Sequence, residues 1–202
     1  AGKYVDYILD HTNIKVIYYG HDLHFLREGR EYTLTGDPER RKAAEYWKSV
    51  ELSLMQKAAV SYYPSYIEEQ AIRQIDDTVS VKAITAYVYE TFKTDINQDF
   101  AGREGLLFVG GFAHPPNADA VLWFASEVWP KIRAVLPISF YIVGSKVTPE
   151  IQAFAAEDNG IVVKGFVSDE ELEELYQSSR LVVVPLRYGA GVKGKVVEAI
   201  YY

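Results

Sequence analysis

Two lysines and a glutamate near the end of the sequence have the types and spacing to hold a phosphorylated ligand. In the glycine-rich run that starts at Arg187, Lys193 and Lys195 open a helical pattern, and Glu198 lies five residues past Lys193. A diphosphate there would gain the cationic charge of the lysines and the N–H groups of the helix N-terminus. Glu198 could accept hydrogen bonds from ribose hydroxyls, as the acidic residue of dinucleotide folds does.

Three other short loops carry glycine, each directly after an apolar run. They are Gly110-Gly111-Phe112, Gly144-Ser145 and Gly165-Phe166-Val167. Glycine lets a ligand approach the backbone closely, and the carboxyl ends of parallel strands share one edge of a sheet. We therefore expect these loops and the run from Arg187 to converge on one cleft. Taken singly, each loop is also typical of a tight turn, and each lysine of a solvated first-turn residue.

The elements that would position these loops alternate between strands and helices in the second half of the chain. Unbroken apolar runs predict strands that are buried on both faces, as in a parallel sheet. Helices are expected from Asn117 to about Ile132 with a kink at Pro130, from Thr148 to about Ala156, and after the capping box that begins at Ser168. The expected strands are 106–109, 139–143, 161–163 and 181–185.

The first half is less regular but of the same kind. Strands are expected at 14–19, 60–63 and 79–83, with a long helix at 38–57 and a shorter one after Ser65. The polar stretch before Gly105 is typical of a linker. We therefore divide the chain into one Rossmann-like domain at 1–90, a linker at 91–104 and a second, incomplete Rossmann-like domain at 105–202. Incomplete patterns at both ends predict a fragment of a longer protein.

Composition excludes several classes of function. The net charge of -7 argues against a nucleic-acid-binding protein, which would present a concentrated basic face. The absence of cysteine excludes disulfides, cysteine-ligated zinc and thiol catalysis, and favours a cytoplasmic setting. The four histidines lack HExxH-like spacing, so a metal site has no support from the sequence. No cofactor is expected either, the nucleoside diphosphate sugar being a substrate. No apolar run approaches the roughly 18 residues of a membrane-spanning helix.

The second half resembles the GT-B glycosyltransferases, and specifically the retaining enzymes of family 4. The stretches that carry the resemblance are 107–120, 165–176 and 184–199. Residues 19–24, with Arg27 and Glu28, resemble the end of the acceptor domain of that family more weakly. The resemblance implies two Rossmann-like domains, the first for the acceptor and the second for the donor, and transfer of a sugar with retention of its anomeric configuration.

The resemblance also assigns roles to residues. Lys193 would neutralise the diphosphate leaving group, Glu198 would hold the ribose, and His21 would face the donor sugar or its phosphate. The remaining expected donor-binding residues are Gly110, Gly111, Phe112, Ser145, Phe166, Val167, Arg187 and Gly191. Two features depart from the family pattern: Ala190 stands where the sugar-contacting glutamate is usual, and Pro115-Pro116-Asn117 stands where a cation often follows the first glycine loop.

The sequence therefore predicts transfer of a sugar from a nucleoside diphosphate sugar to a hydroxyl of a glycan, lipid-linked or small-molecule acceptor. Such a hexosyltransferase would serve glycan or cell-envelope polysaccharide synthesis in the cytoplasm, with peripheral membrane association left open for the full-length protein. The fragment alone is expected to be inactive. Two alternatives stay open: a non-catalytic module that binds a nucleotide sugar, and a Rossmann-type epimerase or oxidoreductase. Against the latter, no GxGxxG run follows the first strand of either half.

Overall fold

The chain folds into two compact α/β units. The computed structural model describes residues 2–91, 100–156 and 159–202. Unit 1 comprises Ala1–Val88 together with Tyr188–Val192, and unit 2 comprises Tyr89–Arg187 together with Lys193–Tyr202. Residues 92–99 of the expected linker lie outside the described residues. The short segment Tyr188–Val192, which we had placed with the second domain, groups with the first unit instead.

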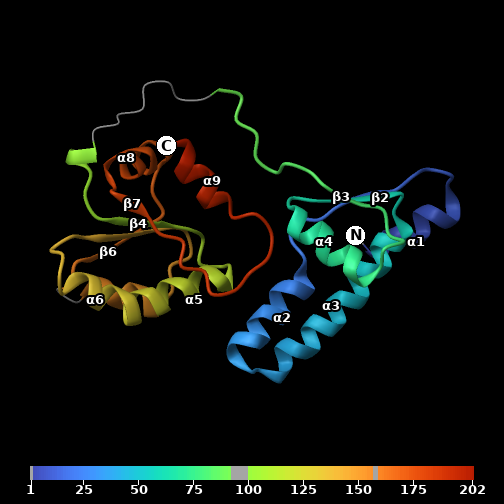
Figure 1. Ribbon diagram of the computed structural model, residues 1–202, viewed down its shortest axis with the longest axis horizontal. Helices are drawn as coiled ribbons and strands as arrows, with labels where there is room; N and C mark the ends of the chain where they lie inside the picture. Colours follow the sequence, from blue (N-terminus) through green and yellow to red (C-terminus); the bar gives the residue numbers. More distant parts are fainter. Residues whose placement is uncertain (1, 92–99, 157–158) are drawn as a thin grey trace. The chain divides into compact units, whose positions relative to one another are not determined.

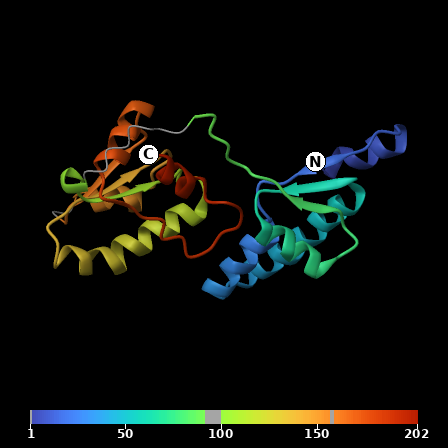
Figure 2. The ribbon, with the colours of Figure 1, turned by 45° about the horizontal axis from the view of Figure 1, so that its top comes forward.

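Unit 1 is built on a parallel sheet of strand order β1-β2-β3. β1 pairs in parallel with β2, with Ile17 opposite Val60, and β2 pairs in parallel with β3, with Ser61 opposite Val81. Helices α2, α3 and α4 lie on one side of this sheet (Figures 1 and 2). The strands are β1 (Ile17–Tyr19), β2 (Val60–Tyr63) and β3 (Val81–Ala83), and the helices are α1 (Gly2–His11), α2 (His24–Thr35), α3 (Pro38–Lys57) and α4 (Tyr66–Ile75).

Helix α2 was not anticipated from the sequence. The side chain of its N-cap residue, Leu23, cannot accept a hydrogen bond, and Gly29 and the threonines Thr33 and Thr35 lower its helix propensity. Two glutamates from other helices supply the missing caps, as described below. Helix α3, by contrast, begins as predicted, because Asp37 accepts a hydrogen bond from the Glu39 amide and Pro38 occupies the first helical position.

Unit 2 is built on a second parallel sheet, of strand order β6-β5-β4-β7. Helices α5 and α6 cover one face of it, and α8 and α9 cover the other (Figures 1 and 2). The strands are β4 (Leu106–Val109), β5 (Phe140–Val143), β6 (Ile161–Gly165) and β7 (Leu181–Val182). The helices are η1 (Phe100–Gly102), α5 (Pro115–Trp123), η2 (Phe124–Val128), α6 (Trp129–Arg133), α7 (Pro149–Ala153), η3 (Phe154–Ala156), α8 (Asp169–Ser178) and α9 (Gly194–Tyr201).

A π-helical turn stands where a kink was predicted. Pro130 has no N–H to donate to the preceding turn, and the chain accommodates this with the π-helix η2 between α5 and α6. The helix also begins at Pro115 rather than at Asn117. Pro115 and Pro116 occupy the first helical positions, where a missing N–H carries little cost, so His114 becomes the N-cap residue.

The predicted caps of α7 and α8 are present, although one capping box is only half formed. Thr148 accepts a hydrogen bond from the Ile151 amide, and Ser168 accepts one from the Glu171 amide. The Glu171 carboxylate accepts from Lys164 Nζ at 2.6 Å, instead of turning back to its own helix. Strand β7 is shorter than predicted and ends at Val182, three residues before Pro185.

The core of unit 2 fills both sides of its sheet. One cluster, centred on Phe108, Phe140 and Trp129, packs against α5, η2 and α6. A second cluster joins Leu107 to Tyr176 of α8 and to residues of α9. Successive β4 residues therefore point into opposite layers, which explains why the sequence of this strand shows no polar alternation. Together the two layers fix the carboxyl ends of β4, β5 and β6.

Candidate functional site

Three of the predicted glycine loops meet at the carboxyl edge of the unit 2 sheet. The Phe112 amide donates to the Ser145 carbonyl at 2.9 Å, which ties the loop after β4 to the loop after β5. The Gly144 amide donates to the Gly165 carbonyl at 2.8 Å, which ties the loop after β5 to the end of β6. A Cβ at Gly144 would lie 2.0 Å from the Gly110 carbonyl oxygen, so only glycine fits there. The expected convergence is thus confirmed for these three loops, whereas Tyr188–Val192 of the run from Arg187 groups with unit 1.

Lys195 reaches from the first turn of α9 to the first of these loops. Its Nζ donates to Asn117 Oδ1 at 2.6 Å, and Asn117 Nδ2 donates to the Gly111 carbonyl at 2.8 Å. The ammonium also lies 4.4 Å from the centre of the Phe108 ring. A Cβ at Gly110 would lie 2.6 Å from Nζ, so the missing side chain at this glycine leaves the space that the lysine occupies. The Lys195 ammonium therefore lies next to the Gly110–Gly111 loop.

Burial makes this lysine easier to deprotonate than a surface lysine. Desolvation, with a smaller contribution from the charge of Lys193, lowers the pKa of Lys195 to about 8. Near neutral pH the side chain is still mainly a cation, and within the described residues its hydrogen-bonding network with Asn117 and the Gly111 carbonyl includes no carboxylate. A phosphate group would supply the missing negative charge, and a lysine acts as a point charge in phosphate sites.

Lys193 lies at the N-terminus of the same helix. It is the N-cap residue of α9, and in the described part of the chain its side chain makes no capping hydrogen bond. The first-turn N–H groups of a helix carry a partial positive charge. The side chains of Lys193 and Lys195 and the start of α9 thus concentrate positive charge at the carboxyl edge of the sheet.

Glu198 lies one turn further along α9, where its Oε2 accepts a hydrogen bond from the Tyr176 hydroxyl at 3.0 Å. Two of the expected donor-binding residues follow β6: Phe166 is 81% exposed, and Val167 packs partly against the core. Ser145 is exposed beside Gly111, since a Cβ on that glycine would lie 3.3 Å from its Oγ. These residues flank the glycine loops, as their positions after the strands suggested.

Two predicted donor-binding side chains have structural partners instead. The Phe112 ring is buried and stacks at 6.1 Å on Phe108, so only its backbone faces the loop. The Arg187 guanidinium donates through Nε to Asp119 Oδ2 at 2.9 Å and lies 5.8 Å from the Trp123 ring. The two Arg187 contacts fasten this part of the chain to α5, which carries Asp119 and Trp123.

In unit 1 the corresponding edge of the sheet is organised by buried carboxylates. His21 follows β1, is exposed, and makes an edge contact with the Tyr19 ring at 5.3 Å. The helix that follows, α2, is capped from outside. Glu51 of α3 accepts from the His24 and Phe25 amides at 2.9 and 3.2 Å and lies 2.9 Å from His24 Nδ1.

The second of these carboxylates belongs to Glu68 of α4. Its Oε1 accepts from the Leu23 amide at 3.0 Å, and the same carboxylate accepts from the Gly191 amide. Burial raises the pKa of Glu68, although these hydrogen bonds oppose the effect. Gly191 itself has a φ of 74°, and a Cβ there would lie 3.0 Å from the His21 carbonyl oxygen. Glycine is therefore required where this segment of unit 1 passes the His21 loop.

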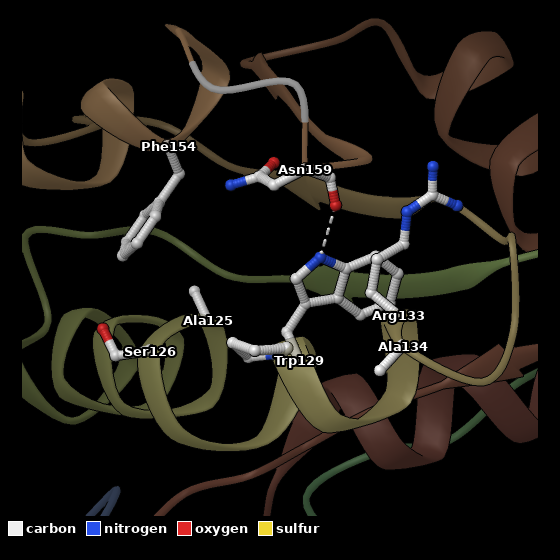
Figure 3. A pocket seen from close by; sticks show the side chains of 8 residues that line it. Ala125, Ser126, Trp129, Arg133, Ala134, Phe154 and Asn159 are labelled. Atoms are coloured by element: carbon white, nitrogen blue, oxygen red, sulfur yellow. Dashed lines mark hydrogen bonds between the residues drawn. The ribbon is translucent and has the colours of Figure 1, made fainter.

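A separate cavity of about 540 Å³ lies in unit 2, away from the glycine loops (Figure 3). Trp129 and Arg133 line it together with Phe154 and Asn159, and the Trp129 indole donates to the Asn159 carbonyl at 2.8 Å. Asn159 precedes β6, so this cavity is near the amino end of that strand. None of the predicted site residues lines it, and ligands of open α/β sheets bind at the opposite edge.

Among the described residues, no group of three or more histidine, cysteine or acidic side chains is arranged to hold a metal ion. Within the same part of the chain, every helix is too short or too polar to cross a bilayer.

Several residues of the sites were not singled out as contacts from the sequence. The sequence placed Asn117 at a helix start and Lys195 beside a possible diphosphate, but it did not indicate that these two side chains contact each other. Their spacing gave a partial signal, because both lie within one turn of a helix N-terminus at the expected edge. Glu51, Glu68 and Tyr176 gave none, because each acts on residues more than 20 positions away.

Comparison of sequences relates the second half of the chain to a known family. Residues 103–202 match the model of a family described as "Glycosyl transferases group 1". An uncharacterized 44.6 kDa protein in the cps region of Klebsiella pneumoniae is 30% identical over 101 residues, which are 47% of this chain and 26% of that protein.

Solved structures with low sequence identity share the fold. TarM matches with a TM-score of 0.70 and 15% identity, over 95% of this chain and 36% of that chain. An alpha,alpha-trehalose 6-phosphate synthase from Burkholderia multivorans matches with a TM-score of 0.55 and 13% identity, over 93% of this chain and 55% of that chain. The chain thus spans about a quarter of the Klebsiella protein and about a third of TarM. Residues 103–202, just under half of the chain, thus match the group 1 glycosyltransferase model, and the two parallel α/β units share the fold of these solved structures.

Proposed function

We propose that this chain is the donor-binding part of a glycosyltransferase that moves a sugar from a nucleoside diphosphate sugar to an acceptor hydroxyl. The observation that carries the proposal is the position of Lys195, a half-buried lysine beside the Gly110–Gly111 loop and at the start of α9. Its location at the carboxyl edge of a parallel sheet is where such folds bind nucleotides. The family match of residues 103–202 supports the same class of reaction.

In this proposal the diphosphate lies against the first turn of α9. Sugar transfer breaks the bond between the anomeric carbon and a phosphate oxygen, so negative charge builds on the departing diphosphate. Lys193 and Lys195 stabilise that charge, together with the first-turn amides. One ionic contact made mainly in the transition state is worth about 3 kcal/mol, or about a hundredfold in rate. Glu198 binds the ribose hydroxyls, and the backbone of Phe166 and Val167 contacts the base.

The finer features of the reaction are also part of the proposal. We infer a retaining hexosyltransferase of family 4 that requires no cofactor, with His21 facing the donor sugar. Its setting is the cytoplasm or the cytoplasmic face of the membrane, and its acceptor is a glycan, a lipid-linked glycan or a small molecule. A role in polysaccharide synthesis is supported by the relative in the cps region. A UDP-containing donor is tested first, because a TarM mutant from S. aureus was solved with fondaparinux, alpha-GlcNAc-glycerol and UDP.

The experiment that tests this function is a donor and acceptor screen. The protein that carries the domain is incubated with UDP-, GDP- and ADP-sugars and with glycan or lipid acceptors, and the released nucleoside diphosphate is measured. Acceptor-dependent release supports transfer, and an α-anomeric product from an α-linked donor, read by NMR, supports retention. Oxidation of the donor with NAD(P), or epimerisation without transfer, would contradict the proposal.

A further inference from the structure

The nucleotide-binding role proposed for Glu198 depends on the direction of its carboxylate. Glu198 is partly buried on α9, and its Oε2 accepts a hydrogen bond from the hydroxyl of Tyr176, which lies 22 residues earlier on α8. A carboxylate offers about four lone-pair sites, and this bond uses one of them. The contact therefore restricts the carboxylate while leaving acceptor capacity for a ligand.

Tyr176 is fixed more firmly than the glutamate that it contacts. Its side chain is 3% exposed and belongs to the core cluster with Leu107, Val143 and Leu175. Its ring stacks on Tyr202, with ring centres 4.9 Å apart and an angle of 10° between the planes. Because this packing holds the whole side chain in place, the hydroxyl oxygen has a fixed position beside Glu198.

The chemistry of the pair keeps the tyrosine protonated. Burial, followed by the charge and the hydrogen bond of Glu198, raises the pKa of Tyr176 well above its usual range. At neutral pH the hydroxyl is therefore always available to donate, and the glutamate is held as the acceptor of the pair. An acceptor of fixed direction suits a ligand that brings donors, such as the vicinal hydroxyls of a ribose.

We propose that Tyr176 is a positioning residue that fixes Glu198 for the 2′,3′-diol of a ribonucleotide, and so makes the site prefer ribonucleotides over their deoxy analogues. The inference rests on the proposed donor site. A site built to accept hydrogen bonds from hydroxyls discriminates against a ligand that lacks them, because its buried acceptor is then left unpaired.

The test is the ratio of two dissociation constants measured by calorimetry on the 202-residue chain. Whichever of UDP, GDP and ADP binds most tightly is compared with its 2′,3′-dideoxy analogue. We expect the unaltered chain to prefer the ribonucleotide by at least about tenfold. Tyr176→Phe should lower that ratio by about fivefold and leave the affinity for the dideoxy analogue within about twofold. Tyr141→Phe removes a hydroxyl from a tyrosine packed against the same cluster and should change neither value.

Glu198→Ala provides a second, independent reading. It should abolish the preference for the ribonucleotide, and Tyr176→Phe should have no additional effect on the ratio in that background. Equal weakening of both ligands by Tyr176→Phe, or an unchanged ratio, would overturn the positioning role while leaving the donor site intact. Failure of every nucleoside diphosphate to bind would overturn the proposed function and this inference with it.

Discussion

In both units a parallel strand is followed by a loop and then by a helix N-terminus. The charged side chains at these two helix N-termini have opposite signs. In unit 1, the first-turn amides of α2 are satisfied by the protein's own carboxylates, Glu51 and Glu68. In unit 2, the first turn of α9 bears lysines, and Lys195 points to a loop of glycines. Since an internal carboxylate occupies the place that an external anion would take, the comparison supports the proposal that unit 2 binds the anion.

The largest effect is expected where a buried carboxylate is removed. Glu51→Ala leaves the amides of His24 and Phe25 without their acceptor at the start of α2. It should lower the free energy of unfolding of unit 1 by about 3 kcal/mol, as measured by urea denaturation. Glu45→Ala, an exposed change on the same helix, should cost less than about 0.5 kcal/mol. If the two variants were equally stable, the carboxylate caps of α2 would not be needed.

Removal of the N-terminal lysine of α9 should affect turnover next most strongly. Lys193→Ala deletes a charge placed to stabilise the departing diphosphate, and we expect the rate of sugar transfer to fall about a hundredfold. Steady-state kinetics of the full-length enzyme with saturating donor would measure it. A rate within about threefold of the unaltered enzyme would remove Lys193 from the mechanism and shift the charge stabilisation to Lys195.

Lys195→Met tests the contribution of the half-buried cation to binding. Loss of one charge-assisted contact should weaken nucleoside diphosphate binding by about thirtyfold. Lys131→Met removes the same charge from an exposed position of α6 and serves as the control, with an expected change below about twofold. Comparable losses in both variants would mean that general charge, rather than the glycine-loop lysine, attracts the ligand.

The dependence of nucleotide binding on pH should also reflect Lys195, with a smaller change in affinity than the Lys195→Met substitution causes. The pKa of Lys195 is about 8 in the free protein, and a bound diphosphate favours the charged form and raises that pKa. The complex then holds more protons than the free protein above pH 8, so affinity must fall as pH rises through that value. We expect Kd to increase up to about tenfold between about pH 7 and pH 9. The profile of Lys195→Met should be nearly flat, and a flat profile in the unaltered chain would contradict the assignment.

The comparison also separates what can be predicted from sequence. The β4 and β5 strands and the loops after them can be predicted from local patterns. Each strand is an apolar run without polar alternation, and it is followed by glycine, which permits a close backbone approach or a positive φ. Helix α2 could not be predicted, because its first turn is stabilised by Glu51 and Glu68 from helices that follow it in the chain. Helical propensity was too weak by itself to reveal it.

The candidate site was predictable in part for the same reason. Spacing alone placed Lys195 in the first turn of α9, but its direction towards Gly110 and Asn117 depends on how α9 packs on the sheet. Arg187, an expected donor contact, is held by Asp119, which lies 68 residues earlier. Sequence patterns identify the edge where ligands bind, whereas tertiary packing decides which charges at that edge remain for a ligand.

One measurement tests the contrast between the two helix N-termini most directly: an NMR titration of the backbone amides with UDP, GDP and ADP. We predict that the nucleotide that binds will perturb the amides of Gly110, Gly111 and the first turn of α9. The amides of Leu23, His24 and Phe25, already occupied by carboxylates, should be unchanged. Saturable shifts centred on the first turn of α2, or no saturable shifts with any of the three nucleotides, would contradict the account.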